Sequence, residues 1–211
     1  GGNRIVAHYM VIYLLCSIGR QLVSAFKNPF LFLDVYLKGQ GTYPYCTLNA
    51  YNVYGIFGLN WKEDSVGTPS LYALSFVLVA VLIAFMIYCY IRAKRNSVWV
   101  MGFFFMNTLF MFMTRMHERY QFVVLIFILM AAVVHKHRGF FYCFVGISVI
   151  TFLNQAIPMF SWRTENSFFD NYYGELMVIF SVVNLILYFI SSYICIKFMF
   201  KNNQKQKEAT V

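Results

Sequence analysis

Long apolar runs separated by short polar segments constrain this chain more than any other feature of its sequence. A helix needs about 20 mostly apolar residues to cross the hydrocarbon core of a bilayer. Six runs approach or reach this length, at residues 5–19, 71–91, 98–113, 121–134, 139–158 and 176–200. Hydrophobic residues make up 60% of the 211 residues and charged residues only 12%, which excludes a soluble domain. The sequence therefore predicts an all-α integral membrane protein, a polytopic helical bundle of about six transmembrane helices with an amphipathic outer loop.

The apolar runs divide the chain into four parts. Residues 1–19 carry a first, partial membrane span, and residues 20–70 form a long amphipathic loop that we expect on the extracytoplasmic face. Residues 71–200 hold a bundle of five spans, and residues 201–211 form a polar cytoplasmic tail that we expect to be disordered. Because the first run is short and no methionine opens the chain, we expect the C-terminal part of a longer protein, with an N-terminal module before Gly1.

Positive charge is unevenly distributed over the polar segments. With six alternating spans, one side carries ten Lys and Arg residues and one acid, whereas the other side carries seven residues of each sign. The basic side is expected to face the cytoplasm, which predicts a multi-pass protein of the cell membrane with a cytoplasmic C-terminus. Since this topology accounts for the formal net charge of +9, the expected partner is the lipid bilayer and not a nucleic acid.

The spacing of cysteine and histidine residues does not indicate a metal site. Four of the five cysteines lie in apolar runs and Cys46 lies in the outer loop, without a C-x-x-C pair. His135 and His137 belong to the basic segment His135-Lys136-His137-Arg138, which we interpret as a turn between two helices on the cytoplasmic side. We expect neither a metal nor a cofactor.

The polar segment 114–120 lies between two apolar runs and is the strongest candidate for a functional site, because ionisable groups at a membrane cost free energy unless they meet a partner or water. On a helix, Arg115 and Arg119 would share one face, and Glu118 would orient Arg115. Two guanidinium groups suit the paired hydrogen bonds of a phosphate, so the expected ligand is an anion. The alternative is a cluster that pairs internally at the membrane surface.

The same segment resembles a known motif. Arg115-Met116-His117-Glu118-Arg119-Tyr120 is similar to the R-M-H-E-R-Y-L-F-P motif of bacterial polytopic GT-C glycosyltransferases, a group described as mannosyltransferases related to the GPI mannosyltransferase II. Residues 43–52 and 58–61 resemble that group's Y-P-Y-x-x-x-N-A-[FY]-N-L-W loop and its G-x-N-W ending. Two departures are present: Gln121-Phe122-Val123 stands in place of Leu-Phe-Pro, and Tyr54 replaces a tryptophan.

The resemblance implies the C-terminal half of a glycosyltransferase that uses a polyprenyl-phosphate-linked, mannose-like hexose to glycosylate a cell-envelope acceptor at the outer face of a bacterial plasma membrane. Its expected phosphate-binding residues are Arg115, His117 and Arg119, with Glu118 and Tyr120 orienting them. Stacking and amide hydrogen bonds to the sugar or headgroup are expected from Tyr45, Asn49, Asn52, Asn60 and Trp61. The catalytic carboxylate is expected in the N-terminal module, so no catalytic residue is assigned within the chain.

Two other classes of function fit the apolar runs and the polar segment. A transporter or flippase of lipid-linked sugars also needs basic groups beside membrane spans, although it favours broken helices near the bilayer midplane. A non-catalytic membrane scaffold is the third interpretation, and it is favoured if the native chain begins at Gly1.

Overall fold

The computed structural model describes residues 42–163 and 172–201. The chain divides into two compact units, Gly1–Pro44 and Tyr45–Val211, and every element discussed below belongs to the second. The expected first span at 5–19, residues 20–41 of the expected outer loop and the tail after Lys201 lie outside the described residues.

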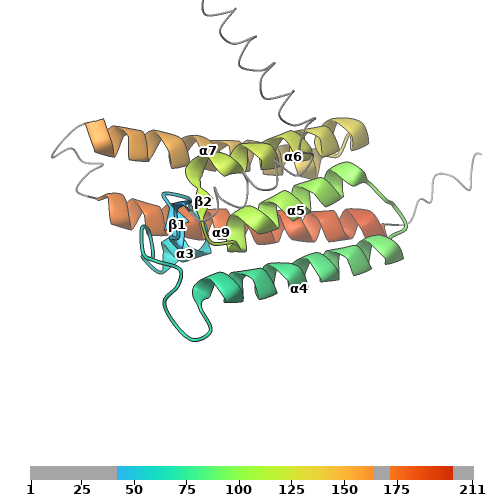
Figure 1. Ribbon diagram of the computed structural model, residues 1–211. Helices are drawn as coiled ribbons and strands as arrows, with labels where there is room; N and C mark the ends of the chain where they lie inside the picture. The colour runs from blue at the N-terminus through green and yellow to red at the C-terminus, as the bar shows by residue number, and fades with distance from the viewer. Residues whose placement is uncertain (1–41, 164–171, 202–211) are drawn as a thin grey trace, which may run out of the picture. The chain divides into compact units, whose positions relative to one another are not determined.

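Five helices form an antiparallel bundle in the second unit, each running opposite to the one before it (Figure 1). They are α4 (Leu71–Arg92), α5 (Val98–Phe112), α6 (Phe122–His135), α7 (Arg138–Arg163) and α9 (Tyr173–Phe200). Their bounds follow the apolar runs closely, except that α7 continues through Pro158 to Arg163 instead of ending at the proline.

Four helical segments are long and apolar enough to cross a membrane. They are Leu71–Arg92, Glu118–His135, Arg138–Ser161 and Tyr173–Phe200. Helix α5 has 15 residues, which rise about 22 Å at 1.5 Å per residue and so fall short of a hydrocarbon core of about 30 Å. The expectation of a helical membrane protein is supported by these four segments, whereas six spans are not established.

Hydroxyl caps and a left-handed residue define several helix ends. The side chains of Ser70 and Ser97 accept hydrogen bonds from the first-turn amides of α4 and α5, as N-cap residues do. At the other end of α6, Lys136 adopts φ 48° and ends the helix. Oγ of Ser97 also lies 2.6 Å from Nε2 of His135, and this hydrogen bond connects the start of α5 to the end of α6.

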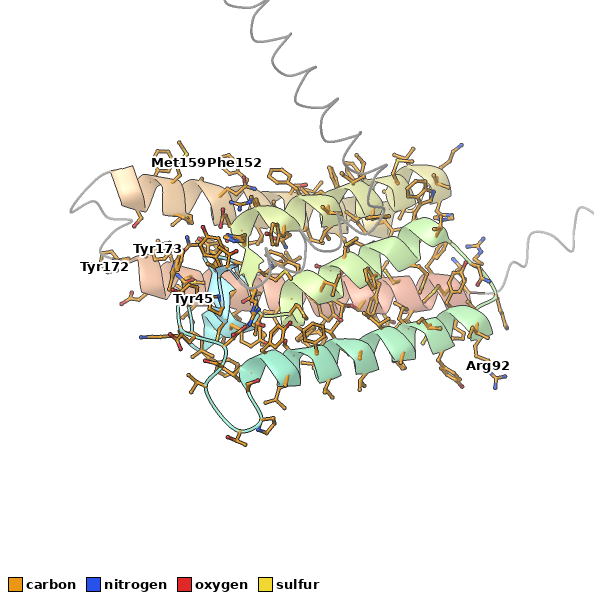
Figure 2. All side chains as sticks on the ribbon, in the orientation of Figure 1. Tyr45, Arg92, Phe152, Met159, Tyr172 and Tyr173 are labelled. Carbon is orange, nitrogen blue, oxygen red and sulfur yellow. The ribbon has the colours of Figure 1, made fainter. Side chains whose placement is uncertain are left out.

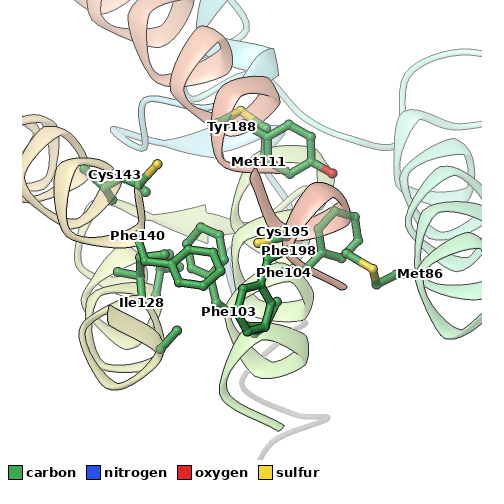
Figure 3. Packing of buried hydrophobic residues seen from close by; sticks show 14 of the residues in the cluster. Met86, Phe103, Phe104, Met111, Ile128, Phe140, Cys143, Tyr188, Cys195 and Phe198 are labelled. Carbon is green, nitrogen blue, oxygen red and sulfur yellow. The ribbon is translucent and has the colours of Figure 1, made fainter. Parts of the chain in front are cut away.

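The core lies where α5 packs against α4, α6 and α9, and where α6 and α9 pack against α7. Figure 3 shows Phe103 and Phe104 of α5 among Ile128, Phe140 and Phe198 from three other helices. A hydrogen bond of 3.1 Å between Oγ1 of Thr108 and the hydroxyl of Tyr188 satisfies two polar groups inside this apolar core. The outward faces remain apolar, as expected for helices surrounded by lipid.

The bundle has two chemically different ends. One end carries the short elements β1 (Thr47–Leu48), α3 (Val53–Ile56), β2 (Met116–His117) and the 3₁₀ helix η1 (Glu118–Gln121). Tyr45, Tyr172 and Tyr173 lie at this end, and Arg92 lies at the other (Figure 2). The described residues of the Arg92 end include seven cations and no acid, namely Arg92, Lys94, Arg95, Lys136, Arg138, Lys197 and Lys201.

Candidate functional site

The two segments that carry the motif resemblance lie against each other. Strand β1 pairs in parallel with β2, with Thr47 opposite Met116 and Leu48 opposite His117. Further bridges join Asn49 to His117 and Thr47 to Asn60. The loop that begins at Tyr45 and the segment that begins at Arg115 therefore form one polar cluster at the end of the bundle, and we call it the β1–β2 cluster.

Arg115 makes a buried ion pair that was not predicted from the sequence. Its Nε donates to Oδ2 of Asp64 at 2.7 Å and its Nη2 donates to Oδ1 at 3.2 Å. The Asp64 side chain is only 1% exposed, and the guanidinium lies 4.0 Å from the centre of the Tyr72 ring. The hydrogen bond to Asp64 raises the pKa of Arg115 above its ordinary value, so this cation is held in place by a carboxylate.

The expected helical arrangement of Arg115, Glu118 and Arg119 is wrong. Arg115 has φ 63°, and its amide donates to the carbonyl of Tyr45, so the segment enters an extended strand instead of a helix. Glu118 pairs with Arg119, at 3.5 Å between Oε1 and Nη1, and not with Arg115. The helical spacing rule fails here because the strand pairing with the loop, together with the ion pair to Asp64, determines the local backbone.

Arg119 is the exposed cation of the motif. Its side chain is 60% exposed, against 16% for Arg115, and its guanidinium lies 5.8 Å from the centre of the Tyr120 ring. Tyr120 also meets the ring of His117 edge-on, at 5.3 Å between centroids. An incoming anion therefore reaches Arg119 more readily than Arg115, although it has to share that guanidinium with Glu118.

His117 lies between these charges, and its surroundings favour the neutral form of the ring. Burial lowers its pKa below the ordinary value, the charge of Arg119 lowers it further, and the charge of Glu118 opposes the shift. Its Nδ1 is 3.9 Å from Oε2 of Glu118. The structure thus places the three expected phosphate-binding residues in one cluster, in which Arg115 is neutralised by Asp64 and Arg119 carries the accessible charge.

Asn49 organises the loop that was expected to contact sugar. Its Oδ1 accepts hydrogen bonds from Nδ2 of Asn60 and Nε1 of Trp61 at 3.0 Å each, and from the hydroxyl of Tyr173 at 2.9 Å. Asn49 has φ 58°, a conformation that asparagine tolerates better than most residues. Its amide oxygen is consequently engaged in holding the loop against α9.

Asn52 also has a structural role, because its Oδ1 caps α3 by accepting from the amides of Tyr54 and Gly55. Asn52 is fully buried, so a ligand at the surface does not reach it in this structure. Among the residues expected to contact sugar, Trp61 offers the open surface: it is 43% exposed and its ring lies 5.4 Å from that of Tyr45. An aromatic surface of this kind suits stacking on a sugar ring.

Two buried hydrogen bonds connect the β1–β2 cluster to the bundle interior. Nε2 of Gln121 donates to Oδ1 of Asn184 at 2.9 Å, and Nδ2 of Asn184 donates to the carbonyl of Tyr51 at 2.7 Å. Neither these two hydrogen bonds nor the role of Asp64 as the partner of Arg115 was predicted from the sequence. Asn184 is the single asparagine inside the apolar run at 176–200, and it was the sequence signal for these hydrogen bonds. A buried amide in a membrane helix requires hydrogen-bond partners.

An apolar groove adjoins the cluster on the lateral surface of the bundle. It encloses about 520 Å³ between α6 and α7, and its lining includes Phe122, Leu125, Phe152, Gln155 and Met159. Phe122 directly follows η1, and Nδ2 of Asn154 donates to the carbonyl of Glu118 at 3.5 Å. Phe152 and Met159 project from α7 on the side away from α9 (Figure 2). The groove therefore begins beside the segment that carries Arg119.

The described residues contain no group of three or more His, Cys, Asp or Glu side chains placed to hold a metal ion. A comparison with known proteins finds no matching family model, no matching curated protein and no matching solved structure.

Proposed function

We propose that this chain is the C-terminal membrane portion of a GT-C glycosyltransferase that uses a polyprenyl-phosphate-linked, mannose-like hexose to glycosylate a cell-envelope acceptor. The observation that carries the proposal is the exposed Arg119 beside the apolar groove between α6 and α7. A polyprenyl-phosphate donor has the same two parts, a phosphate and a long apolar chain. The resemblance of the two motifs supplies the class of reaction.

The charges of the cluster favour Arg119 as the phosphate contact. Arg115 already donates two hydrogen bonds to a buried carboxylate, and separating that pair would leave Asp64 unpaired in an apolar environment. The pair of Arg119 and Glu118 is longer and more exposed, so a phosphate can replace Glu118 at lower cost. Arg115 then acts by fixing the backbone that presents His117 and Arg119.

In the proposed reaction Arg119 stabilises the negative charge that develops on the departing polyprenyl phosphate. The bond between the sugar and the phosphate breaks as the acceptor hydroxyl attacks the sugar, and a carboxylate base takes the hydroxyl proton. Asp64 does not suit that role because it is buried and paired with Arg115. As the motif resemblance implies, we place the base in an N-terminal module, and we assign Trp61 to the sugar.

The unequal charge of the two ends supports an orientation in the membrane. Seven cations without an acid, among the described residues of the Arg92 end, favour a cytoplasmic location for that end. The β1–β2 cluster then lies at the outer face of the plasma membrane, and the C-terminus lies in the cytoplasm. This is the face at which a cell-envelope acceptor is available.

The test compares Arg119→Ala with Lys62→Ala in the full-length enzyme. Lys62 is an exposed cation at the same end of the bundle and lies outside the ion pairs of the motif, so it serves as the matched control. Loss of one charge-assisted phosphate contact costs about 2–4 kcal/mol of transition-state stabilisation, or about 30- to 1000-fold in kcat/KM for the polyprenyl-phosphate hexose. Arg119→Lys restores only part of the rate because an ammonium lacks the planar pair of donors.

Equal transfer rates in the two alanine variants, at matched amounts of folded protein, would contradict the proposal. Movement of the lipid-linked sugar across proteoliposomes without sugar transfer would replace it with the transporter interpretation.

A further inference from the structure

A second pocket lies at the opposite end of the bundle, where α6 turns into α7. It encloses about 340 Å³ and is lined by Val133, Lys136, His137, Arg138, Phe141 and Tyr142, among others. Its lining divides into two kinds: consecutive basic residues in the turn, and apolar or aromatic residues on the adjoining helical turns. The proposed glycosyl transfer does not use this pocket.

The basic residues of this turn meet no acid in the part of the chain that the structure describes. The described residues at this end of the bundle include no Asp or Glu, so Lys136 and Arg138 have no carboxylate partner among them. Other cations at the same end lie over aromatic rings: Arg92 over Tyr88 at 5.8 Å, and Lys197 over Tyr193 at 5.7 Å. Lys136 and Arg138 make no such ring contact within residues 42–163 and 172–201, and both are exposed.

His137 lies in the pocket lining close to cations from other segments of the chain. Its Nδ1 is buried and lacks a hydrogen-bond partner among the described residues. Burial lowers the pKa of His137, and the charges of Lys201 and Arg95 lower it further, so two cations outside the turn also act on this position. An anion placed in the pocket is therefore attracted by charges from three segments of the chain.

The apolar half of the lining faces the surroundings of the bundle. Val133 is 62% exposed, Phe141 51% and Tyr142 67%. A small soluble anion does not need such a surface, whereas a phospholipid covers it with its acyl chains while its phosphate meets the cations. Basic pockets at the ends of membrane helices recognise anionic lipid headgroups through this combination.

We propose that the pocket at the α6–α7 turn is a specific binding site for an anionic phospholipid, with the headgroup phosphate at Lys136 and Arg138 and an acyl chain along Phe141 and Tyr142. The bound lipid bridges the end of α6 and the start of α7. This site is separate from the β1–β2 cluster at the other end of the bundle, so it stands whether or not the chain serves a glycosyltransferase.

The experiment measures lipid retention by native mass spectrometry, with the protein released from an equimolar mixture of phosphatidylglycerol and phosphatidylcholine. We expect the native protein to retain at least one phosphatidylglycerol, and the variant with both Lys136→Gln and Arg138→Gln to retain about 30-fold less, since each of the two cations near the headgroup contributes about 1 kcal/mol. The matched control carries Arg92→Gln and Lys197→Gln, which removes the same charge at the same end. Equal loss in the two double variants, or no preference for phosphatidylglycerol in the native protein, would overturn the proposal.

Two further arms distinguish a lipid site from a loss of fold and from a site for a soluble anion. The charge-retaining variant with Lys136→Arg and Arg138→Lys is expected to keep the preference, which shows that the charges and not the fold were lost in the glutamine variant. Photoreactive phosphatidylglycerol is expected to label residues 133–142 of the native protein. If glycerol 3-phosphate prevents that labelling at the same concentration as phosphatidylglycerol does, the pocket takes a soluble anion and the lipid proposal is wrong.

Discussion

The ion pair between Asp64 and Arg115 gives the most direct test of how the β1–β2 cluster is held together. The variant Asp64→Asn keeps the size of the side chain and removes its charge, which leaves the guanidinium of Arg115 beside a neutral amide. Two hydrogen bonds, at 2.7 and 3.2 Å, depend on that carboxylate, and its side chain is 1% exposed. Removing one partner from a buried pair costs about 3–5 kcal/mol of folding free energy.

That loss of stability is large enough to measure in detergent. For a chain of this size, 1 kcal/mol corresponds to a change in Tm of about 2–4 °C, so Asp64→Asn is expected to lower Tm by about 6–20 °C. The assay is loss of the monodisperse peak in size-exclusion chromatography after heating. Glu63→Gln is the matched control, because it removes the same charge from an exposed neighbour and is expected to change stability by less than about 0.5 kcal/mol.

A double-mutant cycle identifies the partner. If Asp64 acts through Arg115, combining Asp64→Asn with Arg115→Gln costs clearly less than the two single changes added together. Equal Tm values for Asp64→Asn and Glu63→Gln would refute the reasoning, and so would additive effects in the cycle.

Two further predictions concern the same end of the bundle. Asn49→Ala removes the acceptor of three hydrogen bonds and disfavours φ 58°, so it is expected to lower the free energy of unfolding by about 2–4 kcal/mol. Asn49→Gly tolerates the same backbone conformation and is expected to lose less stability. Thermal unfolding of the two variants measures which of them is less stable. Because the pKa of His117 is lowered in the folded protein, the unfolded chain binds this proton first as pH falls below 6.5, and the folding stability decreases there. We therefore expect His117→Gln to show a smaller fall in Tm between pH 7.5 and 5.5 than the native protein does. An unchanged pH dependence in that variant would count against a lowered pKa of His117 in the folded protein.

The helices of the bundle could be predicted from the sequence because the solvent constrains them strongly. The apolar runs at 71–91 and 98–113 are preceded by Ser70 and Ser97 and followed by polar segments. Helices α4 and α5 begin and end within a few residues of these boundaries. Hydrocarbon permits few other backbone conformations, so hydropathy determines these elements well. The apolar run at 139–158 ends at a proline, whereas α7 continues through Pro158 to Arg163.

For the β1–β2 cluster, the sequence indicated several of the residues that take part but not the contacts between them. Charged and aromatic residues in a membrane protein identified Arg115, Arg119, Asn49 and Trp61 as candidates, and the structure places all four at one end of the bundle. Their partners depend on contacts between distant segments: Asp64 meets Arg115 across 51 residues, and Tyr173 meets Asn49 across 124. Local spacing gives no information on such pairs, and for that reason the expected helix from Arg115 to Arg119 was wrong.

The separation of Asp64 from Arg115 also has a consequence for biogenesis. Helices α4 and α5 lie between the two residues, so at a synthesis rate of about 5–20 residues per second Asp64 waits roughly 3–10 s for its partner to be made. If α4 and α5 cross the membrane as a hairpin, the pair forms only after both helices have brought the two residues to the same side. A chain in which one of these helices fails to insert leaves a carboxylate and a guanidinium on opposite faces. The ion pair therefore reports correct insertion of this hairpin before the three helices that follow it, α6, α7 and α9, are complete.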